Sequence, residues 1–233
     1  MGVVIDSSYI KYLRNTHNKD YSARRLTDDC VIHKAINFQA LNILFNDNLT
    51  DCYSFMFPYL KALNMGVSWA DTKFKGLSHF YNPKINRGLP FLKHALTLSK
   101  KYYGLAQNNI RVNIDKALFF LGATAHIIQD MTVPQHAGRK LFGNHYQLEK
   151  YIQDTYFYSK DFSVCDRGEY NLSVEQYLKS NAIFALSTML EYEKIENHNQ
   201  RYFEISKKII PLAQRTTAGL FYEFYKEILA FGK

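Results

Sequence analysis

The chain has 233 residues, of which 47% are hydrophobic, and this is enough for the core of one domain or at most two small ones. Its net charge of +8 is compatible with lipid head groups, phosphate esters or nucleic acid, without choosing among them. The three cysteines give neither a paired framework nor CxxC spacing, so we expect them to be free. No stretch approaches the roughly 20 apolar residues of a membrane span, and no signal peptide is visible at the N-terminus.

Taken in chain order, the first 20 residues are polar and weakly periodic, so we expect residues 1–20 to form an N-terminal arm or pro-segment ahead of a domain over 21–233. A helical period dominates from there. Pro58 predicts a break within the second helix, and Pro134 is expected to end the fourth. A long loop is expected over 67–88. The predicted helices span 33–47, 49–66, 89–106, 110–132, 143–158, 173–194 and 201–230.

The pattern contains no repeat, no low-complexity tract and few convincing strands. An amphipathic helical period with short connections is typical of helix bundles. We therefore predict an all-α fold, a compact multi-helix bundle in a single domain.

The fourth helix poses a chemical problem. Its nearly continuous apolar run from Ala117 to Ile128 predicts a buried helix, yet it carries His126 and Asp130, and His136 follows just past the proline. Burying an imidazole and a carboxylate is unfavourable unless something compensates them. These residues therefore need a buried partner.

Two helices carry a histidine and a carboxylate at i, i+4, namely His126 with Asp130 and His145 with Glu149. This spacing places both side chains on one face, about 5–6 Å apart at Cβ, so that they can converge on one ion. A single pair of this kind is weak evidence, but the first lies in a run too apolar to solvate it. Zinc favours imidazole nitrogen and carboxylate oxygen. Further candidate ligands are Asp71 and His79 in the 67–88 loop, His33 and His136.

The candidate ligands belong to five short motifs in a fixed order. These are "IHKAIN" at His33, "WAD" at Asp71, "SHFYNP" at 78–83, "HIIQDMTVPQHA" at 126–137 and "HYQLE" at 145–149. Near the end, "RTTAGLFYEFY" occupies 215–225. This ordered set resembles the bacterial zinc-dependent phospholipases C from about Tyr21 to the C-terminus. The resemblance implies an all-α domain around a buried cluster of three zinc ions, or at least two.

The resemblance also implies the ligands of each ion. For the first zinc they are Asp71, His79, His126 and Asp130. For a second, more open zinc they are His136, His145 and Glu149. For a third they are Asp130 as a bridge, His33, and the backbone of an N-terminal residue exposed by processing. Tyr21 stands at that place here, where the family has tryptophan, so either the preceding residues are a pro-segment that is removed or the third site is altered.

The family's reaction implies water attack on phosphorus, which releases diacylglycerol and a phosphorylated head group. Asp71 is the candidate for orienting or deprotonating the nucleophile, and it is equally compatible with a role as ligand alone. Phe74, Phe80 and Tyr81 are candidates for the lipid cleft. Arg24 and Thr72 stand where familiar members have an acidic residue and an aromatic that bind choline, which argues against phosphatidylcholine and favours an anionic or smaller head group.

Two alternatives remain. A zinc-dependent single-strand nuclease suits the charge of +8, but such nucleases lack the "SHFYNP" signature, so nucleic acid is not the expected partner. A non-catalytic lipid-binding or host-interaction protein with structural zinc is the other. The resemblance implies a monomer that is secreted or on the cell surface and touches a membrane or micelle surface transiently.

Overall fold

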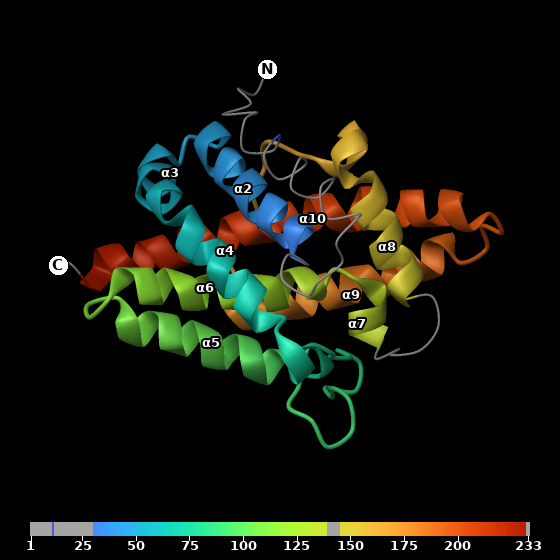
Figure 1. Cartoon of the computed structure of the whole chain (residues 1–233), viewed down its shortest axis with the longest axis horizontal. Helices are drawn as coiled ribbons and strands as arrows, with labels where there is room; N and C mark the ends of the chain where they lie inside the picture. The colour runs from blue at the N-terminus through green and yellow to red at the C-terminus, as the bar shows by residue number, and fades with distance from the viewer. Residues whose placement is uncertain (1–10, 12–29, 139–144, 232–233) are drawn as a thin grey trace.

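The computed structural model describes residues 11, 30–138 and 145–231 and confirms the all-α prediction (Figure 1). Its elements are α2 (Val31–Asn46), α3 (Thr50–Met56), η2 (Phe57–Tyr59), α4 (Leu60–Ala70), η3 (Lys73–Ser78), α5 (Ala95–Asn109), α6 (Ile114–Asp130), α7 (Pro134–Gly138), α8 (His145–Thr155), η4 (Tyr156–Tyr158), η5 (Lys160–Phe162), α9 (Val174–Tyr192) and α10 (His198–Phe231). The described residues contain one isolated β-bridge and no strand. None of the described helices is long and apolar enough to cross a bilayer.

Every predicted helix has a counterpart in the same order along the chain, and the boundaries differ most clearly on the two sides of the predicted 67–88 loop. The break at Pro58 is confirmed, because the 3-10 turn η2 separates α3 from α4. However, α4 continues to Ala70 and shortens the predicted 67–88 loop, since Val67 and Ala70 are both fully buried and extend the apolar face of the helix. Helix α5 begins at Ala95 rather than at residue 89, because Phe91 adopts a positive φ that a helix cannot continue through.

Helix α6 is the central element of the bundle. It packs against α4, α5, α9 and α10, and in Figure 1 it runs between α5 and α10 while α4 crosses it. Every residue from Leu121 to Asp130 is buried. A helix buried on all sides has no solvated face for polar side chains, so those near its C-terminal end must be satisfied inside the protein.

The crossing of α4 over α6 depends on two glycines. A Cβ placed on Gly122 would lie 2.0 Å from the Leu63 carbonyl oxygen, and one on Gly66 would lie 1.8 Å from the Phe119 carbonyl oxygen. Only glycine allows the two backbones to approach this closely. Because His126 follows Gly122 by one helical turn, this contact also sets the distance between His126 and the C-terminal end of α4.

We predict that Gly122→Ala lowers the free energy of unfolding by about 1–3 kcal/mol, because the added methyl group must push the two helices apart. The matched control is Gly104→Ala in α5, where an added Cβ would meet nothing within 4 Å and better helix propensity is expected to stabilise the protein by up to about 1 kcal/mol. Urea denaturation followed by circular dichroism measures both. Equal stability of the two variants would contradict the role of Gly122.

Candidate metal centre

A cavity of about 560 Å³ opens between α2, the C-terminal end of α6, α7, α8 and α10. One part of its lining is apolar and includes Ile32, Ile36, Ile209 and Ile210. The other part is made by predicted zinc ligands. Those lining the cavity are His33, Asp71, His79, His126, Asp130, His136 and Glu149.

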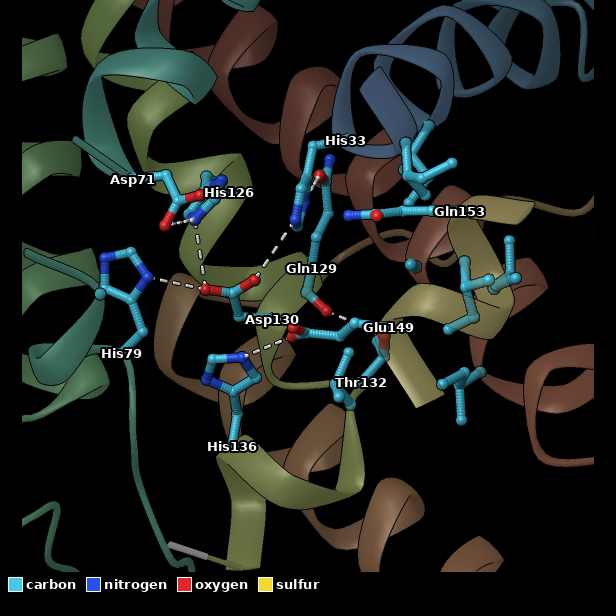
Figure 2. A pocket seen from close by; sticks show the side chains of 18 of the residues that line it. His33, Asp71, His79, His126, Gln129, Asp130, Thr132, His136, Glu149 and Gln153 are labelled. Atoms are coloured by element: carbon cyan, nitrogen blue, oxygen red, sulfur yellow. Dashed lines mark hydrogen bonds and ion pairs between the residues drawn. The ribbon is translucent and has the colours of Figure 1, made fainter. Parts of the chain in front are cut away.

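Asp130 lies at the centre of these side chains (Figure 2). Its Oδ2 atom is 2.8 Å from His79 Nδ1 and 3.2 Å from His126 Nε2, and its Oδ1 atom is 3.5 Å from His33 Nε2. The three imidazoles come from the residue after η3, from α6 and from α2. One buried carboxylate therefore joins three separate parts of the fold.

Asp71 approaches the same cluster from the end of α4. Its Oδ1 atom lies 4.0 Å from His126 Nε2, and 42% of its side chain is exposed. The Cys30 thiol donates a hydrogen bond to Asp71 Oδ2 at 3.6 Å, and burial, then the nearby carboxylates, raises the pKa of that thiol. Cys30 therefore remains a hydrogen-bond donor at neutral pH and leaves Oδ1 of Asp71 towards His126.

A second donor pair stands on the other side of Asp130. Pro134 begins α7, and His136 Nε2 in that short helix lies 3.3 Å from Glu149 Oε1 in α8. The ring of Phe80 lies 4.8 Å from the ring of His136 and lines the cavity beside it. The side chain of His145, the third residue of the predicted set, lies outside the described part of the structure.

The charges and the burial of the centre shift the pKa values of Asp130, His33 and His136. Burial acts to raise the pKa of Asp130, but His126 and His136 outweigh it through their charge, with further hydrogen bonds from the histidines, and the pKa lies well below its usual value. Burial lowers the pKa of His33, and the charge of His126 adds to this. For His136 burial also acts to lower the pKa, but the Asp130 and Glu149 carboxylates raise it overall. The centre therefore holds its central carboxylate ionised.

The donor set fits a metal ion. Nδ1 of His126 and Nε2 of His79 are buried and lack a hydrogen-bond partner, which is costly for a polar atom. Nε2 of His126 is also buried and has ion-pair contacts with the Asp130 and Asp71 carboxylates. The ligand atoms of two groups, His33 with His126 and Asp130, and Asp71 with His79 and His126, lie within 4.8 Å of one another. Two donors on one tetrahedral zinc are about 3.3 Å apart, which is close to the separations around Asp130.

Gln129 is a residue of the centre that the sequence analysis missed. His33 Nδ1 donates a hydrogen bond to Gln129 Oε1 at 2.8 Å, while Gln129 Nε2 donates to Asn37 Oδ1 at 2.9 Å and to Thr217 Oγ1 at 3.0 Å. Asn37 in turn donates to Asn64 Oδ1. A glutamine directly before Asp130 in an apolar helix was the signal available in the sequence.

The substrate residues expected from the sequence separate into three groups. Phe80 lines the cavity. Thr72 and Tyr81 are not brought to it: the Thr72 hydroxyl donates to the Trp69 carbonyl at the end of α4, and Tyr81 is fully buried with its hydroxyl on Asn86. Arg24 and the side chain of Phe74 lie outside the described part of the structure, and so does Tyr21, the residue expected at the third zinc.

Comparisons with known proteins place the chain in a family. A comparison with curated protein sequences found no match. Two solved structures share 18% identity with it: alpha-toxin from Clostridium absonum (TM-score 0.73, covering 88% of this chain and 65% of the toxin) and Clostridium perfringens alpha-toxin from an avian strain (TM-score 0.72, 87% and 64%). This chain thus spans somewhat less than two thirds of either toxin, and the likeness concerns the fold. The model of the family "Zinc dependent phospholipase C" matches residues 32–218, so the chain belongs to the zinc-dependent phospholipase C family.

Proposed function

We propose that this protein hydrolyses the glycerol–phosphate ester of phospholipids to diacylglycerol and a phosphorylated head group. Family membership supports the proposal, and so does one observation: the buried carboxylate of Asp130, contacted by three imidazoles, lines the same cavity as several isoleucines. A lipid presents a phosphodiester beside apolar chains, and a cavity lined by both ionisable and aliphatic side chains is complementary to both. A single-strand nuclease typically stacks bases on aromatic rings, whereas the apolar lining of this cavity is mostly aliphatic.

The donor groups around Asp130 suggest how zinc is held. We propose one ion on Asp71, His79, His126 and Asp130, and a second on His136, Glu149 and His145. A third ion would take His33 and a shared Asp130, together with backbone atoms of Tyr21 once the preceding residues are removed.

When bound, zinc supplies charge neutralisation at the phosphate and lowers the pKa of a nearby water towards neutrality. Asp71 is proposed to accept a proton from the attacking water, because it is partly exposed, borders the cavity and has its Oδ1 atom towards the centre. The water oxygen bonds to phosphorus as the bond from phosphorus to the glycerol oxygen breaks. That oxygen takes a proton from solvent and leaves as diacylglycerol, and Asp71 returns its own proton to solvent. The isoleucines of the cavity would hold the apolar part of the substrate and exclude water.

Gln129 is proposed as a positioning residue for His33. The amide oxygen accepts the Nδ1 proton of His33, which assigns the lone pair to Nε2, the atom that faces Asp130. Hydrogen bonds of this kind fix the tautomer and ring orientation of metal-binding histidines. Because Asn37 and Thr217 hold the Gln129 amide, α2, α6 and α10 all contribute to the position of one ligand.

The first test is hydrolysis of mixed phospholipid micelles, with and without a zinc chelator. We expect chelator-sensitive release of diacylglycerol, a loss of at least about 100-fold in Asp130→Asn, and a preference for phosphatidylglycerol or phosphatidylinositol over phosphatidylcholine. Thin-layer chromatography of the products measures all three. If the zinc-loaded protein releases no diacylglycerol but cleaves single-stranded nucleic acid, the phospholipase proposal is wrong and the nuclease alternative holds.

A second prediction concerns Gln129→Leu, which leaves the buried Asn37 and Thr217 groups short of a partner and is expected to cost about 1–3 kcal/mol of stability. We also expect weaker zinc binding, about 10- to 100-fold, at the site that His33 serves. Equilibrium dialysis with zinc analysis measures the binding. The matched control is Gln153→Leu, an exposed glutamine of the same cavity, and equal zinc affinity in both variants would overturn the positioning role.

The third prediction concerns the N-terminus. We propose a secreted or cell-surface monomer whose residues 1–20 are removed before it becomes active, since the family's third ion takes the backbone of a processed N-terminus. A chain beginning at Tyr21 is then expected to bind more zinc per molecule than the full chain and to release more diacylglycerol. Mass spectrometry with zinc analysis compares the two chains. Identical zinc content and identical rates would show that processing plays no part.

A further inference from the structure

The excess of basic over acidic residues comes from one segment of the chain. The chain has 29 basic and 21 acidic residues, and residues 72–114 contain eight of the basic residues and no aspartate or glutamate. The rest of the chain therefore has 21 residues of each sign, so this segment accounts for the whole excess of +8. The eight cations are Lys73, Lys75, Lys84, Arg87, Lys93, Lys100, Lys101 and Arg111.

Within this segment, the loop over residues 82–94 carries apolar side chains into solvent. Phe91 is fully exposed, Ile85 is exposed by 52% and Leu92 by 42%. Phe91 also has a φ of +63°, a region that bulky residues rarely occupy and in which glycine would be less strained. Folding gains little from this side chain, because it buries no surface. In Figure 1 the loop between η3 and α5 projects beyond the helices at the lower edge.

Three exposed cations, Lys84, Arg87 and Lys93, flank the apolar side chains of this loop. Apolar side chains that enter a bilayer interface, flanked by cations that attract acidic head groups, are the combination by which peripheral proteins bind anionic membranes. We propose that loop 82–94 is a membrane-docking surface that inserts Phe91 into a bilayer containing anionic phospholipid.

The docking loop is joined to the wall of the cavity. The Phe80 carbonyl accepts a hydrogen bond from Ala95 N at 3.3 Å, and a Cβ on Gly88 would lie 2.7 Å from that same carbonyl oxygen. Phe80 and the half-exposed Leu77 both line the cavity. A bilayer held by the loop would therefore lie beside the entrance of the cavity. In this respect the inference rests on the proposed function, because it names how the lipid substrate is reached.

The test compares Phe91→Ser with Val112→Ser in the full-length, zinc-loaded protein. Val112 is the matched control, because it is 81% exposed and follows the far end of α5, a helix of 15 residues that is about 22 Å long. Cosedimentation measures binding to phosphatidylcholine vesicles with and without phosphatidylglycerol. Hydrolysis is measured on the same vesicles and on a short-chain phosphatidylglycerol that remains monomeric in water.

We expect Phe91→Ser to bind anionic vesicles about tenfold more weakly and to hydrolyse them correspondingly more slowly, with unchanged hydrolysis of the monomeric lipid. Lys84→Ala and Lys93→Ala should each weaken binding to anionic vesicles about fivefold without affecting neutral ones, while Val112→Ser behaves as wild type. Unchanged vesicle binding of Phe91→Ser would overturn the inference. Vesicle binding that depends on Phe91, in a protein that cleaves neither lipid, would refute the proposed function and leave the docking surface standing.

Discussion

The need to compensate the buried carboxylate of Asp130 is the constraint on which the rest of the structure depends. A carboxylate that is 5% exposed cannot remain ionised in the interior without opposite charge or hydrogen-bond donors around it. The bundle provides imidazoles from three elements, and two of these carry ring nitrogens that no protein group satisfies. We propose a metal ion as the partner of this carboxylate and of the histidines around it.

One helix, α6, positions most of the candidate metal centre. Gly122 permits the close crossing with α4, His126 and Asp130 follow on the same helix, and Gln129 connects it to α2 and α10 by hydrogen bonds. Displacing α6 would therefore move the donors and the residues that orient them together. This arrangement provides the rigid support that a preorganised metal site needs.

The fold class and several residues of the candidate site were predictable from local sequence patterns. The hydrogen bonds that orient these residues depend on tertiary contacts and were not. The helical period and the buried polar residues His126 and Asp130 predict an all-α bundle with an internal site, because both signals lie within a few residues of each other. The hydrogen bond from His33 to Gln129 spans 96 positions, so no local pattern indicates it. Tyr81 illustrates the converse, since its motif neighbours Phe80 and His79 reach the cavity while its own side chain packs into the core.

The central claim is that Asp130 and the histidines around it bind zinc, and the most direct measurement is a crystal structure of the zinc-loaded protein with diffraction data on both sides of the zinc absorption edge. We predict an anomalous peak about 2.0–2.2 Å from an oxygen of Asp130 and from Nε2 of His126. Zinc-loaded crystals with no anomalous peak within bonding distance of Asp130 would contradict it.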